Sequence, residues 1–394
     1  MNRLINLLFV LLFFSCVNEN NNPPNNYLGF LIANDSINIP FNFNLNDSLM
    51  IIRNSRENIY LSISNSNDSI KVNSPFFEDF LMFVEFKDSF SGFYYNKSLK
   101  RKIQFFAKPG ANRFNFKAND YKNFDGKWKM VFNYDDEAYN AELMVLQNKN
   151  KISGTVRTET GDYGFMEGVV NGKKISVSNF NGYRGYMISG DLDNDTIRGN
   201  LYRGNYDVKK FIAYKDVDFK LSDPYGLTKI KKGYENFIFS FKNSDGELIS
   251  NSDEKFNDKV SLIQIMGSWC PNCLDESRYL SELSKKYDEI MITSIAFEFA
   301  NSKEKAINNI KKLRKNLDLS HDILLAQYGS SNKDDAIKKL PSLDTLISYP
   351  TLIVVDKHQK VRRIHTGFNG PATGQKHENF KNEFELFLEK IIAE

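Results

Sequence analysis

Two cysteines three positions apart, in the stretch GSWCPNCLDE at residues 267–276, carry the most recognisable chemistry of this chain. Cys270 and Cys273 follow Trp269, between a predicted buried strand and a predicted helix. At the start of a helix, free backbone N–H groups and the helix dipole stabilise a thiolate on Cys270. Pro271 fits just inside that start, where its missing N–H costs nothing. Cys273 then lies on the same face and can close a disulfide with Cys270, so the spacing predicts dithiol–disulfide exchange.

Metal binding and a purely structural disulfide are weaker interpretations of the same pair. A zinc site needs about four ligands. The histidines that would have to complete it show no ligand spacing: His321, His358, His365 and His377. A disulfide that closes so short a ring stabilises a fold very little. We therefore expect a reactive pair, with no bound metal and no other cofactor.

The third cysteine, Cys16, ends the N-terminal segment MNRLINLLFVLLFFSC. A positive charge precedes an apolar run that is too short for a membrane-spanning helix of about 20 residues but suits a secretory signal. The segment resembles a bacterial lipoprotein signal, although Phe13 stands where that pattern usually has leucine. The resemblance implies a signal peptide over residues 1–15, a lipid on Cys16, and a flexible tether over residues 16–26. An ordinary signal peptide with an unrelated cysteine is the alternative.

The composition sets bounds on the rest of the chain. It has 394 residues, 41% of them hydrophobic and 33 of them phenylalanine, enough for a sizeable core and for two or three domains. The net charge of +3 is small for this length, and no basic cluster stands out. Nucleic acid is therefore not an expected partner.

Residues 27–217 have the pattern of an all-β region of unknown role. Short alternating apolar runs are separated by Asn, Asp, Gly and Ser, and NKNK and NGKK occupy turn positions between strand-like arms. We expect an antiparallel sandwich or a barrel-like fold, as one domain or two, without a catalytic constellation of its own. Residues 218–235 are predicted to be a linker.

From residue 236 to residue 394 strand-like and helix-like segments alternate, which is typical of an α/β fold. The run KVSLIQIMG is a buried strand that leads into the cysteine pair, and EIMITSIAF, DILLA and TLIVVD are further strands. Apolar residues at helical spacing predict the remaining elements: helices over 271–287, 302–317, 332–340 and 376–393. The chain is thus predicted to be multidomain.

A proline at the mouth of an apolar strand gives a second signature. SYPTLIVVD places Pro350 where a central strand disfavours proline. The residues that complete the pattern are Trp269, Cys270, Cys273 and Glu276, with GFNGPATG in the last loop. With them, residues 236–394 resemble the TlpA/ResA-like thiol–disulfide oxidoreductases of the thioredoxin superfamily. The resemblance implies a thioredoxin-like fold with a cis Pro350 beside the cysteines, and contacts of Trp269, Tyr349 and Pro350 with substrate. An ordinary trans proline is the alternative.

Two features depart from thioredoxin. The two residues between the cysteines are Pro-Asn instead of Gly-Pro, and Gln264 stands where thioredoxin has a buried aspartate. Glutamine cannot exchange a proton, so we assign that role to Glu276, which shares an apolar helical stripe close to Cys273. Desolvation would raise its pKa and suit it to proton transfer; a solvated first-turn glutamate is the alternative. Asp275, on the opposite face, is predicted to be a surface residue.

These features together predict a periplasm-facing protein, lipid-anchored in the bacterial cell envelope, that reduces disulfides of exported proteins through Cys270 and Cys273. The expected partners are protein disulfide substrates and a membrane thiol-reductant carrier as electron donor. A thiol peroxidase of peroxiredoxin type is one alternative. Another is a ligand-binding lipoprotein in which the β-rich region binds the main ligand and the redox domain is secondary.

Overall fold

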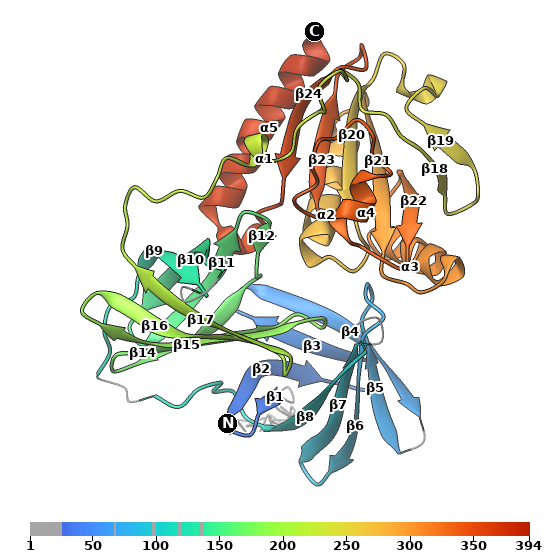
Figure 1. Cartoon of the computed structure of the whole chain (residues 1–394). Helices are drawn as coiled ribbons and strands as arrows, with labels where there is room; N and C mark the ends of the chain where they lie inside the picture. Colours follow the sequence, from blue (N-terminus) through green and yellow to red (C-terminus); the bar gives the residue numbers. More distant parts are fainter. Residues whose placement is uncertain (1–25, 67, 97–99, 117–119, 134–136) are drawn as a thin grey trace, which may run out of the picture.

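The computed structural model describes residues 26–66, 68–96, 100–116, 120–133 and 137–394. Three β-sheet units follow one another along the chain, and the last of them carries the main helices (Figure 1). In this part of the chain no helix combines the length and the apolar character needed to cross a membrane. Cys16 and the signal segment predicted before it lie outside the described residues.

The first unit is a closed antiparallel barrel in which each strand pairs with the next and β1 pairs with β8. Its strands are β1 (Asn26–Asn34), β2 (Ile37–Leu45), β3 (Leu49–Asn54), β4 (Glu57–Ser66), β5 (Ser69–Asn73), β6 (Phe80–Phe86), β7 (Ser89–Asn96) and β8 (Arg101–Pro109). Side chains alternate between the interior and the outside, and phenylalanines such as Phe41, Phe83 and Phe105 fill the interior. The interior is therefore a packed core.

The second unit is a nine-stranded antiparallel sheet in the order β10-β9-β17-β16-β15-β14-β13-β11-β12, with a further pairing of β10 and β11. Its strands are β9 (Gly126–Phe132), β10 (Tyr139–Asn148), β11 (Lys151–Thr158), β12 (Gly161–Asp162), β13 (Met166–Asn171), β14 (Lys174–Phe180), β15 (Gly185–Asp193), β16 (Thr196–Arg203) and β17 (Asp207–Tyr214). The short β12 ends the sheet and projects toward the third unit (Figure 1).

The two β units share part of one core. Phe180 and Met187, from the second unit, belong to the hydrophobic cluster of the barrel. The buried Asn54 amide donates a hydrogen bond to the Phe180 carbonyl at 2.9 Å, and the Arg113 guanidinium reaches the Ser178 carbonyl at 2.8 Å. These contacts hold the two units together.

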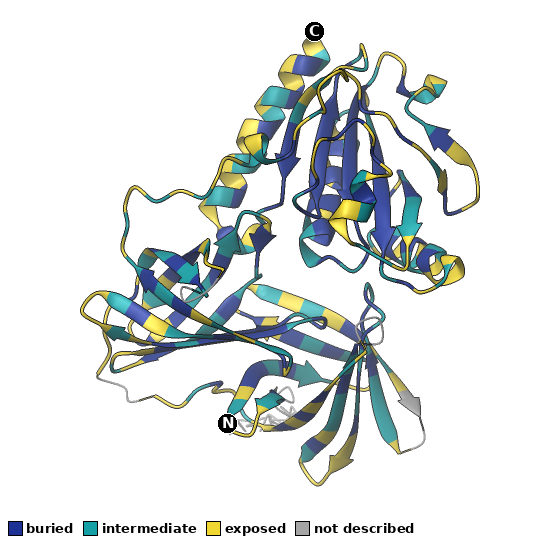
Figure 2. Ribbon diagram, viewed as in Figure 1, coloured by how far each residue is buried: buried dark blue, intermediate teal, exposed yellow. Residues whose placement is uncertain are grey.

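The third unit is a seven-stranded sheet in the order β19-β18-β22-β21-β20-β23-β24. Its strands are β18 (Ser240–Asn243), β19 (Leu248–Ser250), β20 (Val260–Met266), β21 (Ile290–Glu298), β22 (Asp322–Tyr328), β23 (Thr351–Val355) and β24 (Val361–Thr366). β20, β21 and β22 run parallel, and the outer strands pair antiparallel. The central strands are buried along their length, as expected for a sheet covered on both faces (Figure 2).

Helices cover both faces of this sheet. The helical elements are α1 (Pro224–Leu227), α2 (Pro271–Lys286), α3 (Lys303–Asn316), α4 (Lys333–Ile337) and α5 (Gln375–Ala393), with short 3₁₀ turns at Glu254–Phe256 and Pro371–Thr373. On one face Leu262 of β20 packs in a cluster with Leu280 of α2 and Phe384 of α5. On the other face Ile265 packs with Ile310 of α3. Alternate residues of β20 therefore serve two cores.

The predicted fold class is confirmed: an all-β N-terminal region precedes an α/β C-terminal unit. The predicted helices are present with small shifts at their ends, and the helix predicted over 332–340 (α4) stops earlier than expected, at Ile337. The α/β unit docks onto both β units. The barrel loop before β6 inserts Phe77, which stacks on Tyr183 at 4.5 Å within the core of the α/β unit. Lys312 of α3 fixes this loop through the carbonyls of Ser74 and Phe77, at 2.7 and 3.1 Å.

Candidate active site

The cysteine pair lies at the start of α2, directly after the buried strand β20. Cys270 is the N-cap residue, and its sulfur accepts the Cys273 N–H at 3.3 Å. The Cys270 thiol donates to the Tyr349 carbonyl at 3.4 Å, and both cysteines are free thiols. Cys270 is 6% exposed and Cys273 is 0% exposed. Burial raises the pKa of Cys273 well above its usual value, and the adjacent Cys270 acts in the same direction. Cys270 is therefore the more accessible of the two sulfurs, and burial favours the protonated form of Cys273.

Trp269 forms one side of the approach to Cys270. Its indole N–H donates to the Phe297 carbonyl at 2.9 Å, and its ring packs against Phe299 and, edge-on, against Tyr349. A Cβ on Gly267 would lie 2.3 Å from the indole nitrogen, so the residue under the ring has to be glycine. The sequence motif thus includes the glycine that seats the tryptophan.

Pro350 directly precedes β23 and ends the loop that faces the cysteines, and the Tyr349–Pro350 peptide bond is cis. The bond has the isomer that the resemblance implies. The Tyr349 carbonyl accepts the Cys270 thiol in this state, and Pro350 accepts the Gly367 N–H at 2.9 Å. The substrate contacts assigned to Trp269, Tyr349 and Pro350 stay predictions.

Gln264 and Glu276 lie beneath the pair. Gln264 donates to the Cys273 carbonyl at 3.1 Å, and its oxygen accepts the hydroxyls of Ser277 and Ser294 at 2.9 and 3.0 Å. These hydrogen bonds join β20 to α2 and to β21. Glu276 is 0% exposed, in agreement with its predicted place in the apolar stripe.

The Glu276 carboxyl is an isolated acid in this core. Within the described residues neither of its oxygens has a hydrogen-bond partner, although Gln264 lies close enough to favour the ionised form. Burial is the main cause that raises its pKa to about 8, and Cys270 adds to the effect. Such a group changes its charge near neutral pH, as a proton acceptor must.

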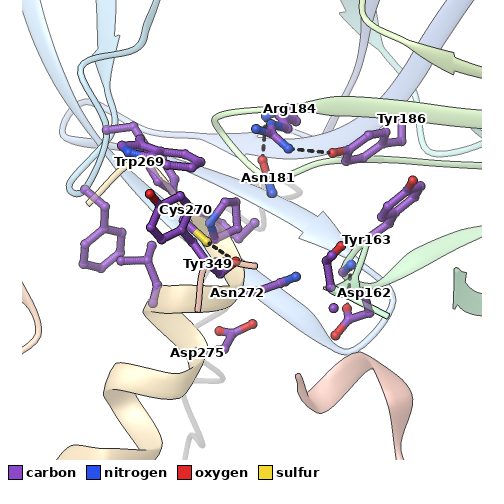
Figure 3. Close-up of a pocket in the computed structure, with 18 of the residues that line it drawn as sticks. Asp162, Tyr163, Asn181, Arg184, Tyr186, Trp269, Cys270, Asn272, Asp275 and Tyr349 are labelled. Atoms are coloured by element: carbon purple, nitrogen blue, oxygen red, sulfur yellow. Dashed lines mark hydrogen bonds between the residues drawn. The ribbon is translucent and has the colours of Figure 1, made fainter. Parts of the chain in front are cut away.

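A cavity of about 220 Å³ opens beside Cys270, and all three units line it (Figure 3). Asn272, the second residue between the cysteines, faces β12. With its amide nitrogen toward the Asp162 carbonyl, it pairs with the backbone of Asp162 in both directions, at 3.2 and 3.3 Å. The Asp162 carboxylate accepts the Gly370 N–H at 2.6 Å. The second β unit therefore contacts the first turn of α2 and the loop that contains Gly370.

The prediction that Asp275 is a plain surface residue is wrong. It lines the cavity, forms an ion pair with Arg278 at 2.6 Å, and has its pKa raised by burial. Glu57 of β4 and Asp162 of β12 complete an acidic side of the same cavity. The helix face that points away from the α/β core is thus covered by the β units.

The sequence interpretation missed the residues that the β units contribute to this cavity. They are Glu57, Asp162, Tyr163, Asn181, Arg184 and Tyr186. Each lies in an ordinary strand or turn sequence, and only the packing of the units brings them to Cys270. Across the described part of the chain, no cluster of three or more His, Cys, Asp or Glu side chains is arranged to hold a metal ion.

Comparisons with known proteins agree with this geometry. Residues 231–382 match the family model described as Redoxin. The thiol-disulfide oxidoreductase ResA of Bacillus thuringiensis subsp. konkukian is 28% identical over 178 residues, which cover 44% of this chain and 88% of that protein. ResA of Bacillus cereus is 27% identical over 163 residues, 41% of this chain and 80% of that protein. A solved thiol-disulfide oxidoreductase from Bacteroides fragilis is 21% identical, covers 37% of this chain and 99% of that one, and has a TM-score of 0.29.

The C-terminal unit is therefore a domain of the thioredoxin superfamily. Within that superfamily it is TlpA/ResA-like, which confirms the resemblance drawn from the cysteine and proline motifs. The matches to the two relatives cover 44% and 41% of this chain.

Proposed function

We propose that this chain, a thiol–disulfide oxidoreductase, reduces disulfides of exported proteins in the cell envelope through the Cys270/Cys273 dithiol. The observation that carries the proposal is the placement of the two sulfurs. Cys270 borders a cavity at a helix N-terminus, and Cys273 is completely buried behind it. An outer sulfur that attacks and an inner sulfur that resolves are the two parts that dithiol exchange needs.

The exchange has two steps. The Cys270 thiolate attacks one sulfur of the substrate disulfide, a mixed disulfide forms, and the other substrate sulfur leaves as a thiolate. Cys273 then loses its proton and attacks the Cys270 sulfur. The second substrate thiolate leaves, and the Cys270–Cys273 disulfide remains. Two electrons pass from the protein to the substrate, and a membrane thiol carrier is proposed to return them.

Glu276 is proposed to take the proton that Cys273 must lose. It lies one helical turn from Cys273, and its charge is among the influences that raise the pKa of that thiol. Because the mixed disulfide removes the thiolate of Cys270, the carboxylate would be the remaining base near the buried sulfur. Gln264 cannot act in its place, because a carboxamide does not take up a proton near neutral pH.

The cellular context of the proposal follows from the N-terminal segment and the relatives. We propose that Cys16 carries the lipid, that residues 16–26 tether the described units to the membrane, and that the protein faces the periplasm. The segment order of charge, apolar run and cysteine supports the anchor. The ResA relatives support the redox class.

Single-cysteine variants test the proposal. With dithiothreitol as reductant, Cys270→Ser should abolish reduction of a model protein disulfide. Prereduced Cys273→Ser that has been freed of dithiothreitol should instead accumulate a stable mixed disulfide with the substrate, because the first attack survives and the resolution does not. The double variant is the matched blank, and mass spectrometry of the trapped species identifies the attacking sulfur. Normal turnover of Cys273→Ser would contradict the two-step exchange.

A further inference from the structure

Arg184 is a charged residue of the Cys270 cavity that has no ion-pair partner among the described residues. It lies in the turn before β15, where the Asn181 side chain accepts its backbone N–H at 2.7 Å. In the view of Figure 3 it lies with Tyr186 above Cys270, while Asp162 and Asp275 lie lower. Its guanidinium donates to the Tyr186 hydroxyl at 3.4 Å. Arg184 thus faces the space that a substrate on Cys270 would fill.

No carboxylate neutralises this arginine. Its Nε is buried without a hydrogen-bond partner, and it forms no ion pair with any described residue. Asp79 is close enough for Arg184 to lower its pKa, but the two side chains form no ion pair. By contrast, Arg278 in the same cavity is paired with Asp275 at 2.6 Å. The Tyr183 ring, whose centre lies 4.9 Å from the guanidinium, and the Tyr186 hydroxyl contact this cation, but neither supplies a carboxylate. A buried cation without a counter-ion destabilises the fold, and a guanidinium matches a carboxylate as a hydrogen-bond partner.

The other side of the cavity has the opposite character. Glu57, Asp162 and Asp275 come together there from three different units. Burial and mutual repulsion raise the pKa of Glu57 to about 7 and that of Asp162 to about 6. Above about pH 7 Glu57 and Asp162 are mostly ionised, and they then repel a further carboxylate. A substrate that carries one would therefore be directed to Arg184.

The dimensions of the cavity restrict the substrate as well. Its volume of about 220 Å³ lies below the range of roughly 300–1,000 Å³ that is typical of sites for drug-sized ligands. β12 and the Phe76–Phe77 loop form its walls and stand close to the pair. A cysteine on an extended segment, with one neighbouring side chain, fits such a space better than the surface of a folded domain.

We propose that this cavity selects extended peptide segments in which a carboxylate flanks the disulfide, and that Arg184 binds that carboxylate. The inference builds on the proposed function, in which the Cys270 thiolate attacks the substrate. In the mixed disulfide the segment's carboxylate pairs with the guanidinium while its cysteine is bonded to Cys270. The leaving thiolate and the two transferred electrons are those of the exchange already described. Arg184 is thus a residue that determines specificity.

Isosteric substrates test the inference. Single-turnover rates of the prereduced chain are measured with the disulfide dimers of N-acetyl-Asp-Cys-amide and N-acetyl-Asn-Cys-amide, and with dithiodipropionic acid and its diamide. Each rate is divided by that of dithiothreitol with the same compound, which removes differences in intrinsic reactivity. The wild type should prefer the Asp over the Asn peptide about tenfold, the effect of one charge-assisted hydrogen bond. High salt should reduce this ratio.

Variants assign the preference to the residue. In Arg184→Gln the ratio should fall to about one, while Arg184→Lys should keep part of it. Arg198→Gln, on the exposed side of β16, removes the same charge and should leave the ratio unchanged. Circular dichroism shows whether each variant is folded.

The possible outcomes distinguish a failure of this inference from a failure of the proposed function. A wild type without a preference, or a preference that persists in folded Arg184→Gln, would overturn the role of Arg184. A preference for dithiodipropionic acid but not for the Asp peptide would overturn the assignment to peptide segments, whereas a preference for both supports it. If the reduced chain reacted with none of the four compounds faster than dithiothreitol does, the proposed function itself would fall.

Discussion

Replacing Glu276 by glutamine separates the charge of this buried group from its shape. The carboxyl is fully buried, and its pKa is raised from 4.5 to about 8. An amide has nearly the same size but cannot ionise. The wild-type fold must hold a charge in an apolar core at high pH, and the Glu276→Gln fold never does.

The size of the effect follows from the shift of the pKa. At 1.36 kcal/mol per pH unit, a shift from 4.5 to about 8 corresponds to about 5 kcal/mol between the two limits of pH. The native state binds the proton more tightly than the unfolded state, so the free energy of unfolding falls as the pH rises from the unfolded to the folded pKa. At pH about 5 the free energies of unfolding of the wild type and Glu276→Gln should differ by about 1 kcal/mol at most. At pH about 8.5 the variant should be more stable by about 4 kcal/mol.

Urea unfolding followed by circular dichroism at a series of pH values measures this difference. Other buried acids titrate in the same range, Glu298 and Asp162 among them. They are present in both proteins, however, so the difference between variant and wild type isolates Glu276. If the two curves of unfolding free energy against pH ran parallel, Glu276 would have an ordinary pKa and the reasoning would be refuted.

The same variant tests the proposed proton transfer. Resolution of the mixed disulfide in the wild type should quicken as pH rises through about 8, because the carboxylate that accepts the Cys273 proton becomes available. In Glu276→Gln this inflection should disappear, and the step should slow on the order of 100-fold, as for loss of a general base. Quenched-flow measurement of the mixed disulfide gives the rate of this step alone. Equal rates at all pH values would leave Glu276 without a part in the reaction.

Two further perturbations test the docking and the anchor. Gly161→Ala introduces a Cβ 1.9 Å from the Asn272 amide at a φ of +133°, so it should lower the free energy of unfolding by about 2 kcal/mol and slow the attack by Cys270. The control Gly226→Ala places its Cβ with no atom within 4 Å and should lower the free energy of unfolding by less than about 0.5 kcal/mol. Equal melting temperatures of the two variants would contradict the docked geometry. Cys16→Ala should move the protein from the membrane fraction to the soluble fraction, and a variant that stays wholly in membranes would indicate a different anchor.

Local signals explain what the sequence alone could predict of the site. An apolar strand, a tryptophan, Pro271 at the first helical position and the three-residue spacing of the cysteines all lie within one short stretch. The burial of Glu276 follows from helical periodicity on that same stretch. Each of these inferences needs only neighbouring residues, and the structure agrees with all of them.

Long-range packing explains what could not be predicted. The hydrogen bond between Asp162 and Gly370 joins residues 208 positions apart, which no periodicity reports. A helical wheel predicts that Asp275 is a surface residue, because it treats the face away from the core as solvent-exposed. β12 covers that face here. The sequence likewise leaves undecided whether the strands close into a barrel, because alternation identifies strands but not which outer strands pair. In the structure β1 pairs with β8.

The β units form part of the site around Cys270, because Asn272 pairs with β12. In a lone thioredoxin-like domain the two residues between the cysteines face whatever approaches them. Here the second of these residues is already held by the backbone of Asp162, and Gly161 leaves just enough room for it. A substrate therefore meets Cys270 in a space bounded by another unit of the same chain. The β units supply Arg184, Glu57 and Asp162 to that space, and the C-terminal domain supplies Asp275 and Arg278. We therefore expect selection among disulfides to depend on the β units, and the sulfur chemistry to depend on the C-terminal domain.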